Sequence, residues 1–243
     1  FIHKTPWQPK AIRAEVEAIE AALPPGAWPN YVMGNHDEQR LASRYGKEQV
    51  RVAAMLLLTL RGTPTLYQGD ELGMESVEIP PEKQKDPFGL RVPGFGRDPC
   101  RTPMQWTPAE NAGFSPPGVE TWLPLSPKYK EENVEVELRD PTSVLNLYRK
   151  LLALRRASPA LKRGSYRSIG ETTDECFSFL REAGGQSYLI TLNFSDNETH
   201  PLTGLAGKGK ICLSTGLDRS GSISLDMLSL RPHEGLIIEL KEG

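Results

Sequence analysis

The stretch Tyr31-Val-Met-Gly-Asn-His-Asp-Glu-Gln-Arg40 passes from a short apolar run into a cluster of polar side chains. A second stretch, Thr63-Pro-Thr-Leu-Tyr67, ends in the same way, in Gln68-Gly-Asp-Glu71. Short apolar runs bounded by turn-forming residues are typical of buried β-strands. In a parallel β/α fold, polar residues that follow the carboxyl end of a strand lie at the mouth of the site. The two stretches therefore predict two strands that each carry polar side chains to such a mouth.

Helical patterns flank both predicted strands. Residues Pro9 to Leu23 place apolar side chains at helical spacing and stop at Pro24-Pro25, and Lys47 to Arg61 form a more apolar helix with Gly62 as its cap. Asp140-Pro141 is expected to open a third helix that ends near Ser158-Pro159. Alternation of helices and short strands favours an α/β fold, with part of a (β/α)8 TIM barrel.

The segment 74–140 is long and rich in proline and glycine. Loops of this length in a compact domain are usually functional or disordered. Its aromatic side chains favour an ordered loop. We therefore expect it to cover the mouth of the site.

The pattern changes after about residue 164. Short strand-like segments, separated by turn formers such as Gly184-Gly185, begin at Cys176, Ser187, Lys210 and Gly235. They predict an all-β antiparallel sandwich domain. The predicted domains are therefore 1–163, the barrel part, and 164–243, the β-sandwich.

Composition excludes several classes of protein. The 243 residues carry a net charge of −2 with scattered Lys and Arg, which argues against a nucleic-acid or anionic-membrane partner. The longest apolar run, Val52 to Leu60, is about half of the ~20 residues that a bilayer span needs. Cys100, Cys176 and Cys212 lie far apart without metal-ligand spacing, so we expect free thiols, a reducing compartment such as the cytoplasm, and no metal or cofactor.

The polar clusters after the strands have two interpretations. Asn35-His36-Asp37 and Asp70-Glu71 could cap helices in the β-to-α turns, which is the favoured interpretation for Asp70-Glu71. Alternatively, they are side chains of the site itself. Residue types alone leave both interpretations open for His36 and Asp37.

Several motifs add a resemblance to a known family. The stretch Gly34 to Arg40 resembles the seventh-strand motif of the α-amylase family of glycoside hydrolases (family 13), and Gly62 to Gly73 resembles its eighth-strand segment. Gly96-Arg-Asp-Pro-Cys-Arg-Thr-Pro-Met-Gln-Trp106 and Asn111 to Ser115 resemble the α-glucosidase and oligo-1,6-glucosidase branch. The likeness runs over about residues 9–163, and it implies the C-terminal part of the barrel.

The resemblance implies roles for individual residues. Asp37 is the expected catalytic residue, a carboxylate that holds the sugar's hydroxyls more tightly as the ring distorts towards an oxocarbenium-like transition state. His36 is expected to donate a hydrogen bond to the same sugar. Arg97 and Arg101 are candidate substrate-binding residues that hold a catalytic carboxylate or a second sugar unit.

Structural alternatives stand beside these roles. Arg97 and Arg101 could anchor the loop through ion pairs, and Asp37 could form a structural salt bridge with Arg40. Trp106 and Phe114 could stack on a glucose ring, although packing under the loop is favoured for both. Tyr67 is expected to pack in its strand.

The resemblance also implies that the nucleophile and the acid/base carboxylate come from the fourth and fifth strands, upstream of Phe1. We therefore expect the C-terminal part of a retaining α-glucosidase that acts on short gluco-oligosaccharides and is inactive without its N-terminal part. Its expected partners are the oligosaccharide and that missing part of the barrel, with no nucleic acid and no membrane.

Two other functions compete with hydrolysis. The same carboxylates serve a transglycosylase or isomerase of the family, such as a trehalose-forming or sucrose-rearranging enzyme. A non-catalytic relative, such as an amino-acid-transporter heavy chain, is the third possibility. An intact Asn35-His36-Asp37 argues against it, because a protein without catalytic activity does not require these side chains.

Overall fold

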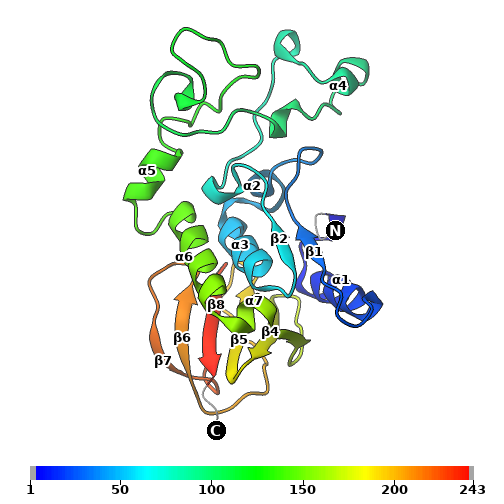
Figure 1. The fold of residues 1–243 in the computed structure, drawn as a ribbon, viewed down its shortest axis with the longest axis vertical. Coiled ribbons are helices and arrows are strands. Elements are labelled where there is room, and N and C mark those ends of the chain that lie inside the picture. The colour runs from blue at the N-terminus through cyan, green and yellow to red at the C-terminus, as the bar shows by residue number, and fades with distance from the viewer. Residues whose placement is uncertain (1–3, 241–243) are drawn as a thin grey trace. The chain divides into compact units, whose positions relative to one another are not determined.

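The computed structural model describes residues 4–240 (Figure 1). The chain forms two compact units. The first contains the chain up to Val32, Arg51–Thr65 and the chain from Leu147 onward, and the second contains Met33–Val50 and Leu66–Asn146. Among residues 4–240, no helix combines the length and the apolar character that crossing a bilayer requires.

Two strands and two helices of the first unit form the barrel part. Helix α1 (Pro9–Ala22) precedes β1 (Asn30–Val32), and α3 (Val50–Thr59) connects β1 to β2 (Thr63–Thr65). The strands pair in parallel, with Tyr31 opposite Pro64. The predicted α/β fold with part of a (β/α)8 barrel is confirmed here.

Helix α3 contains most of the long apolar run Val52 to Leu60. All seven residues from Val52 to Leu58 are buried, so the helix is enclosed on every side. It ends at Thr59, two residues earlier than predicted, and Gly62 does not cap it. A Cβ at Gly62 would lie 2.9 Å from the Pro29 carbonyl oxygen, so this glycine lets the chain enter β2 close beside the Pro29–Tyr31 backbone.

The third predicted helix begins later than expected. Helix α6 (Val144–Ala157) is capped by Ser143, whose Oγ accepts a hydrogen bond 3.1 Å from the backbone N–H of Asn146. Asp140 instead closes the preceding turn by accepting the N–H of Thr142 at 2.8 Å. The prediction that Asp140-Pro141 opens this helix was therefore wrong. Its predicted end is confirmed, since Ser158 caps the next helix, α7 (Pro159–Arg163).

The C-terminal part of the first unit is an antiparallel sheet in the order β3-β4-β5-β8-β6-β7, which confirms the predicted antiparallel β-domain. The six strands are β3 (Ser165–Ser168), β4 (Cys176–Ala183), β5 (Gln186–Asn193), β6 (Lys208–Ser214), β7 (Gly221–Ser224) and β8 (Gly235–Leu240). Helix α7 packs beside β4 and β5 (Figure 1). The sequence patterns missed β3 and β7, whose short, serine-rich runs lack an apolar signal. The boundary at 163/164 stays a prediction.

The second unit consists mainly of the long loop. It contains α2 (Leu41–Tyr45), α4 (Pro87–Arg91) and α5 (Val134–Arg139) (Figure 1). Short 3₁₀ turns lie at Lys47–Gln49, Asp70–Leu72, Pro81–Lys83, Asp98–Cys100 and Glu110–Gly113. Its apolar cluster is formed by Leu72, Met74, Met104, Val134 and Leu145.

Candidate active site at Asp37

The chain after β1 reaches the site through Gly34, which lies against the side chain of Asp70. A Cβ on Gly34 would lie 2.5 Å from Oδ2 of Asp70, so a larger residue here would displace the Asp70 carboxyl group. The backbone at Gly34 therefore lies directly against the Asp70 carboxyl group. This close approach fixes the position of the backbone from which the next three residues, Asn35-His36-Asp37, continue.

Asn35 shapes the turn that presents Asp37. Its Oδ1 accepts hydrogen bonds from the backbone N–H groups of Asp37 at 2.8 Å and Glu38 at 3.1 Å. Asparagine commonly closes turns in this way, because its short side chain reaches the backbone two residues ahead. The turn leaves the Asp37 side chain 51% exposed.

Three cationic or potentially cationic side chains surround Asp37. Arg97 Nη1 and Arg101 Nη2 each lie 3.2 Å from Oδ1, and His36 Nε2 lies 3.3 Å from Oδ2. Arg101 also donates from Nε to the His36 carbonyl at 2.8 Å, which ties the two residues together. The structure thus brings all four predicted site residues into one cluster.

The charges around Asp37 keep its carboxyl group ionised. Loss of solvent alone would raise its pKa, but the hydrogen bond from Arg97 and the charges of His36, Arg97 and Arg101 outweigh it and lower the pKa. The half-exposed carboxylate can accept hydroxyl hydrogen bonds and can stabilise positive charge. It is poorly suited to donate a proton near neutral pH.

Arg97 is held in place by a residue that the sequence analysis missed. Its Nε and Nη2 donate to Oδ2 and Oδ1 of Asp86, both at 2.8 Å, and its backbone N–H donates to Oδ2 at the same distance. Asp86 is fully enclosed, and these hydrogen bonds hold its pKa far below the ordinary value. Arg97 therefore both anchors the loop and touches Asp37, so the two alternatives for this arginine are not exclusive.

The sequence offered only a weak signal for Asp86. It precedes Pro87 and accepts the N–H of Phe88 at 3.1 Å, the ordinary behaviour of an N-terminal capping residue. Nothing in that local pattern predicts a bond to an arginine eleven residues ahead.

Arg40 does not pair with Asp37. It is buried and donates to the carbonyls of Gln68 at 2.6 Å and Thr102 at 3.3 Å, with its guanidinium 5.4 Å from the centre of the Tyr67 ring. The proposed salt bridge with Asp37 was therefore wrong in its partner. The carbonyl contacts explain why, since they occupy this guanidinium inside the second unit.

The Asp70-Glu71 cluster binds the backbone of its own turn. Asp70 Oδ2 accepts the N–H of Tyr67 at 3.2 Å, and Glu71 Oε2 accepts the N–H of Gly69 at 2.8 Å. These contacts agree with the favoured structural role of the two acids. Burial, partly offset by the Tyr67 N–H and by Arg40, raises the pKa of Asp70 to about 7.

The aromatic side chains of the loop differ from the prediction. Trp106 and Phe114 are 48% and 51% exposed, so the expectation that they pack under the loop was wrong. Tyr67 is half-buried and donates from its hydroxyl to the Cys100 carbonyl at 3.1 Å.

Within residues 4–240, no group of three or more His, Cys, Asp or Glu side chains is arranged to hold a metal ion.

Comparison with known proteins identifies the family to which the chain belongs. The family model for the α-amylase catalytic domain matches residues 2–164. The oligo-1,6-glucosidase of Parageobacillus thermoglucosidasius is 31% identical over 97% of this chain and 47% of its own length. The human amino acid transporter heavy chain SLC3A1 is 35% identical over 89% of this chain and 31% of its own length.

A solved structure agrees with these matches. An isomaltulose synthase variant from Erwinia rhapontici NX5, in complex with its natural substrate sucrose, superposes with a TM-score of 0.83 at 29% identity, over 97% of this chain and 47% of that one. The chain thus spans about half the length or less of the curated relatives it matches. The match over residues 2–164, together with relatives that cover nearly the whole chain, shows that this protein belongs to the α-amylase family.

Proposed function

We propose that this chain is the C-terminal part of a retaining α-glucosidase that hydrolyses α-glucosidic bonds of short gluco-oligosaccharides. The observation that carries the proposal is the Asp37 carboxylate, ionised and half-exposed between Arg97, Arg101 and His36. The similarity to oligo-1,6-glucosidases and α-glucosidases supports the choice of substrate.

The arrangement suits the stabilisation of an oxocarbenium-like transition state. The free face of the Asp37 carboxylate accepts hydrogen bonds from hydroxyls of the distorted sugar, and those bonds tighten as positive charge develops on the ring. His36 donates to the same ring. Arg97, fixed by Asp86, keeps Asp37 ionised and oriented.

In this proposal, the nucleophile and the acid/base carboxylate belong to a part of the enzyme outside these 243 residues. Retaining hydrolysis needs two further carboxyl groups about 5 Å apart, one to attack the sugar and one to protonate the leaving oxygen. Asp37 performs neither step, because its lowered pKa leaves no proton to give, and its Oδ1 contacts both arginines while its Oδ2 contacts His36. By itself the chain is therefore proposed to be inactive.

The proposal is tested with the variant Asp37→Asn in the complete enzyme, using maltose and isomaltose as substrates. We expect kcat to fall by roughly 10²–10³-fold or more, because the neutral amide no longer stabilises the charge of the transition state. Circular dichroism checks that the fold is kept. The matched control is Asp174→Asn, an exposed aspartate paired with Lys10, which should leave kcat unchanged. Near-normal turnover of Asp37→Asn would remove Asp37 from the mechanism.

Transfer rather than hydrolysis is the second candidate, supported by the similarity to a sucrose-bound isomaltulose synthase. The two reactions differ in whether water or a sugar hydroxyl attacks the covalent intermediate. Product analysis separates them: the complete enzyme should release glucose from maltose. Disaccharide products without free glucose would contradict hydrolysis.

A non-catalytic role is the remaining alternative, suggested by the similarity to the transporter heavy chain. The assembled Asp37 cluster argues against it. Absence of both glucose and disaccharide products from the complete, folded protein would favour this role over either reaction.

A further inference from the structure

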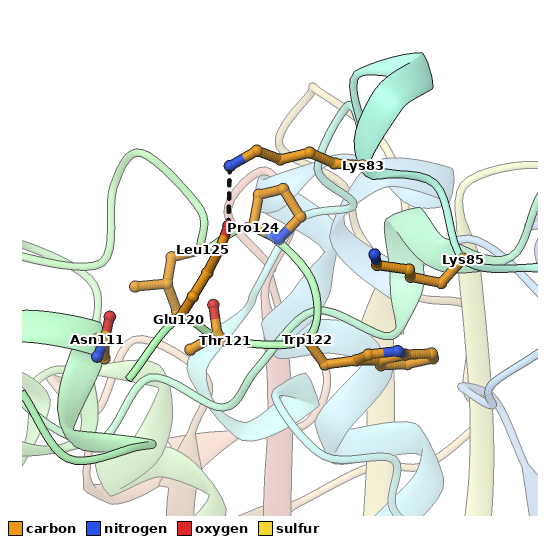
Figure 2. Close-up of a pocket in the computed structure, with 8 residues that line it drawn as sticks. All are labelled: Lys83, Lys85, Asn111, Glu120, Thr121, Trp122, Pro124 and Leu125. Atoms are coloured by element: carbon orange, nitrogen blue, oxygen red, sulfur yellow. Dashed lines mark hydrogen bonds and ion pairs between the residues drawn. The ribbon is translucent and has the colours of Figure 1, made fainter. Parts of the chain in front are cut away.

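A pocket of about 410 Å³ lies in the second unit, and none of the four residues of the Asp37 cluster lines it. Its volume falls within the usual range for small-molecule sites. Two segments of the long loop form it, with polar and aromatic side chains from Lys83, Lys85, Asn111, Glu120, Thr121 and Trp122 (Figure 2).

Trp122 offers a large flat surface at this pocket. Its side chain is 59% exposed, and its indole N–H has no hydrogen-bond partner among the described residues. In Figure 2 the ring lies with Lys85 at one end of the pocket, and Asn111 lies at the other end. The negative face of an indole ring attracts the weakly positive C–H groups on one face of a pyranose.

The polar groups of the pocket include both donors and acceptors. Lys83 Nζ lies 3.3 Å from Glu120 Oε1, so these two charges offset each other. Lys85 and the Trp122 N–H can donate, while the Glu120 carboxylate can accept. Sugar hydroxyls both donate and accept, so a neutral sugar can pair with both kinds of group.

The pocket is held by hydrogen bonds within its own walls. Asn111 Nδ2 donates to the carbonyls of Pro116 at 3.0 Å and Val119 at 2.9 Å, which joins the two sides of the 111–119 turn. Thr121 Oγ1 donates to the Leu123 carbonyl at 2.7 Å, beside Trp122. Sites for small ligands are usually preformed in this manner, which limits the entropy lost on binding.

We propose that this pocket is a second carbohydrate-binding site, which takes a glucose unit of a neutral gluco-oligosaccharide by stacking on Trp122. The choice of gluco-oligosaccharide rests on the proposed function, whereas the site itself rests on the pocket. Binding here does not require Asp37, because no residue of the Asp37 cluster lines the pocket.

The test uses the complete enzyme with Asp37→Asn, which is expected to slow turnover strongly, labelled with 5-fluorotryptophan. The variant Trp122→Phe identifies the Trp122 fluorine resonance by its disappearance. Titration with maltotriose and isomaltotriose should shift that resonance until it saturates. Calorimetry with Trp122→Ala should show this binding weakened about tenfold, since the stacking surface is lost. The matched control Trp106→Ala removes another exposed tryptophan and should leave the titration midpoint of Trp122 unchanged.

Two results would overturn the inference. One is a Trp122 resonance that does not move with either trisaccharide. The other is a resonance that moves with glucose 6-phosphate but not with the neutral sugars, which would indicate an anion site built on Lys83 and Lys85. Failure of the proposed function shows separately, in the turnover of the unsubstituted enzyme and of Asp37→Asn, because the fluorine signal reports binding alone.

Discussion

At the scale of single residues, two aspartates near the site have opposite pKa shifts. Asp37 lies among arginines, which lower its pKa, whereas Asp70 is buried against Gly34 with few compensating contacts, which raises its pKa to about 7. Environment rather than residue type therefore separates them. Asp37 stays ionised for its proposed role, and Asp70 exchanges a proton near neutral pH.

The Asp70 shift predicts a pH-dependent stability. Its folded-state pKa exceeds the ordinary value of 3.8, so between about pH 4 and 7 the folded state holds a proton that the unfolded state has lost. The free energy of unfolding should fall as pH rises through this window and level off above it. The contribution is at most about 4 kcal/mol, since each pKa unit is worth about 1.4 kcal/mol.

Guanidinium denaturation of the wild type and Asp70→Asn at pH 5 and pH 8 measures this contribution. The asparagine keeps an acceptor for the Tyr67 N–H but carries no charge, so the variant should lose less stability between the two pH values than the wild type. An equal loss in both proteins would show that Asp70 does not titrate in this window.

At the scale of elements, two buried arginines hold the end of α3. Arg155 of α6 donates to the carbonyls of Leu58 at 2.8 Å and Leu60 at 3.0 Å, and also to that of Gly62. Arg181 of β4 donates to the Thr59 carbonyl. The last carbonyls of a helix have no partner within it, and here they are shielded from water. A guanidinium provides several donors and a positive charge at the negative end of the helix.

Replacing Arg155 should therefore destabilise the first unit. We expect Arg155→Met to cost about 3 kcal/mol in the free energy of unfolding, because it leaves buried carbonyls without donors. Its neighbour Arg156 is exposed on the same helix, and Arg156→Met should change stability by no more than about 0.5 kcal/mol. Chemical denaturation of both variants checks the difference. Equal effects would assign the loss to helix charge rather than to the buried carbonyls.

At the scale of the whole molecule, the proposed missing part of the barrel has a measurable consequence. Among the described residues, β1 and β2 pair only with each other, which leaves unpaired strand edges. Several large apolar side chains of the second unit are exposed, namely Phe88, Leu90, Phe95 and Phe114. Unpaired edges and exposed apolar surface promote association. The 243-residue chain expressed alone should therefore self-associate and should not release glucose from maltose.

Size-exclusion chromatography with light scattering, over a range of protein concentrations, measures the association. The complete enzyme serves as the control and should keep one discrete mass and full activity. A monomeric and active 243-residue chain would contradict the proposal that the nucleophile and acid/base carboxylate lie outside it.

Patterns over a few residues determined much of this protein from sequence alone. Periodicity located α1, α3, α6 and the four longer strands of the β-domain, because helix and strand formation depend on neighbours in the chain. The polar triplet Asn35-His36-Asp37 indicated the candidate site, because it directly follows an apolar run that predicts a strand. Together with the order of the motifs, these features indicated the family that the comparisons then showed.

Partners distant in sequence were decided only by the tertiary structure. The contacts of Asp37 with Arg97, of Arg97 with the enclosed Asp86, and of Asp70 with Gly34 join residues that local patterns do not relate. Exposure of Trp106 depends likewise on how the loop folds back on itself. Each such contact requires the closure of a loop. Which of the possible loop closures is the most stable depends on the packing of the whole chain rather than on the identity of either residue.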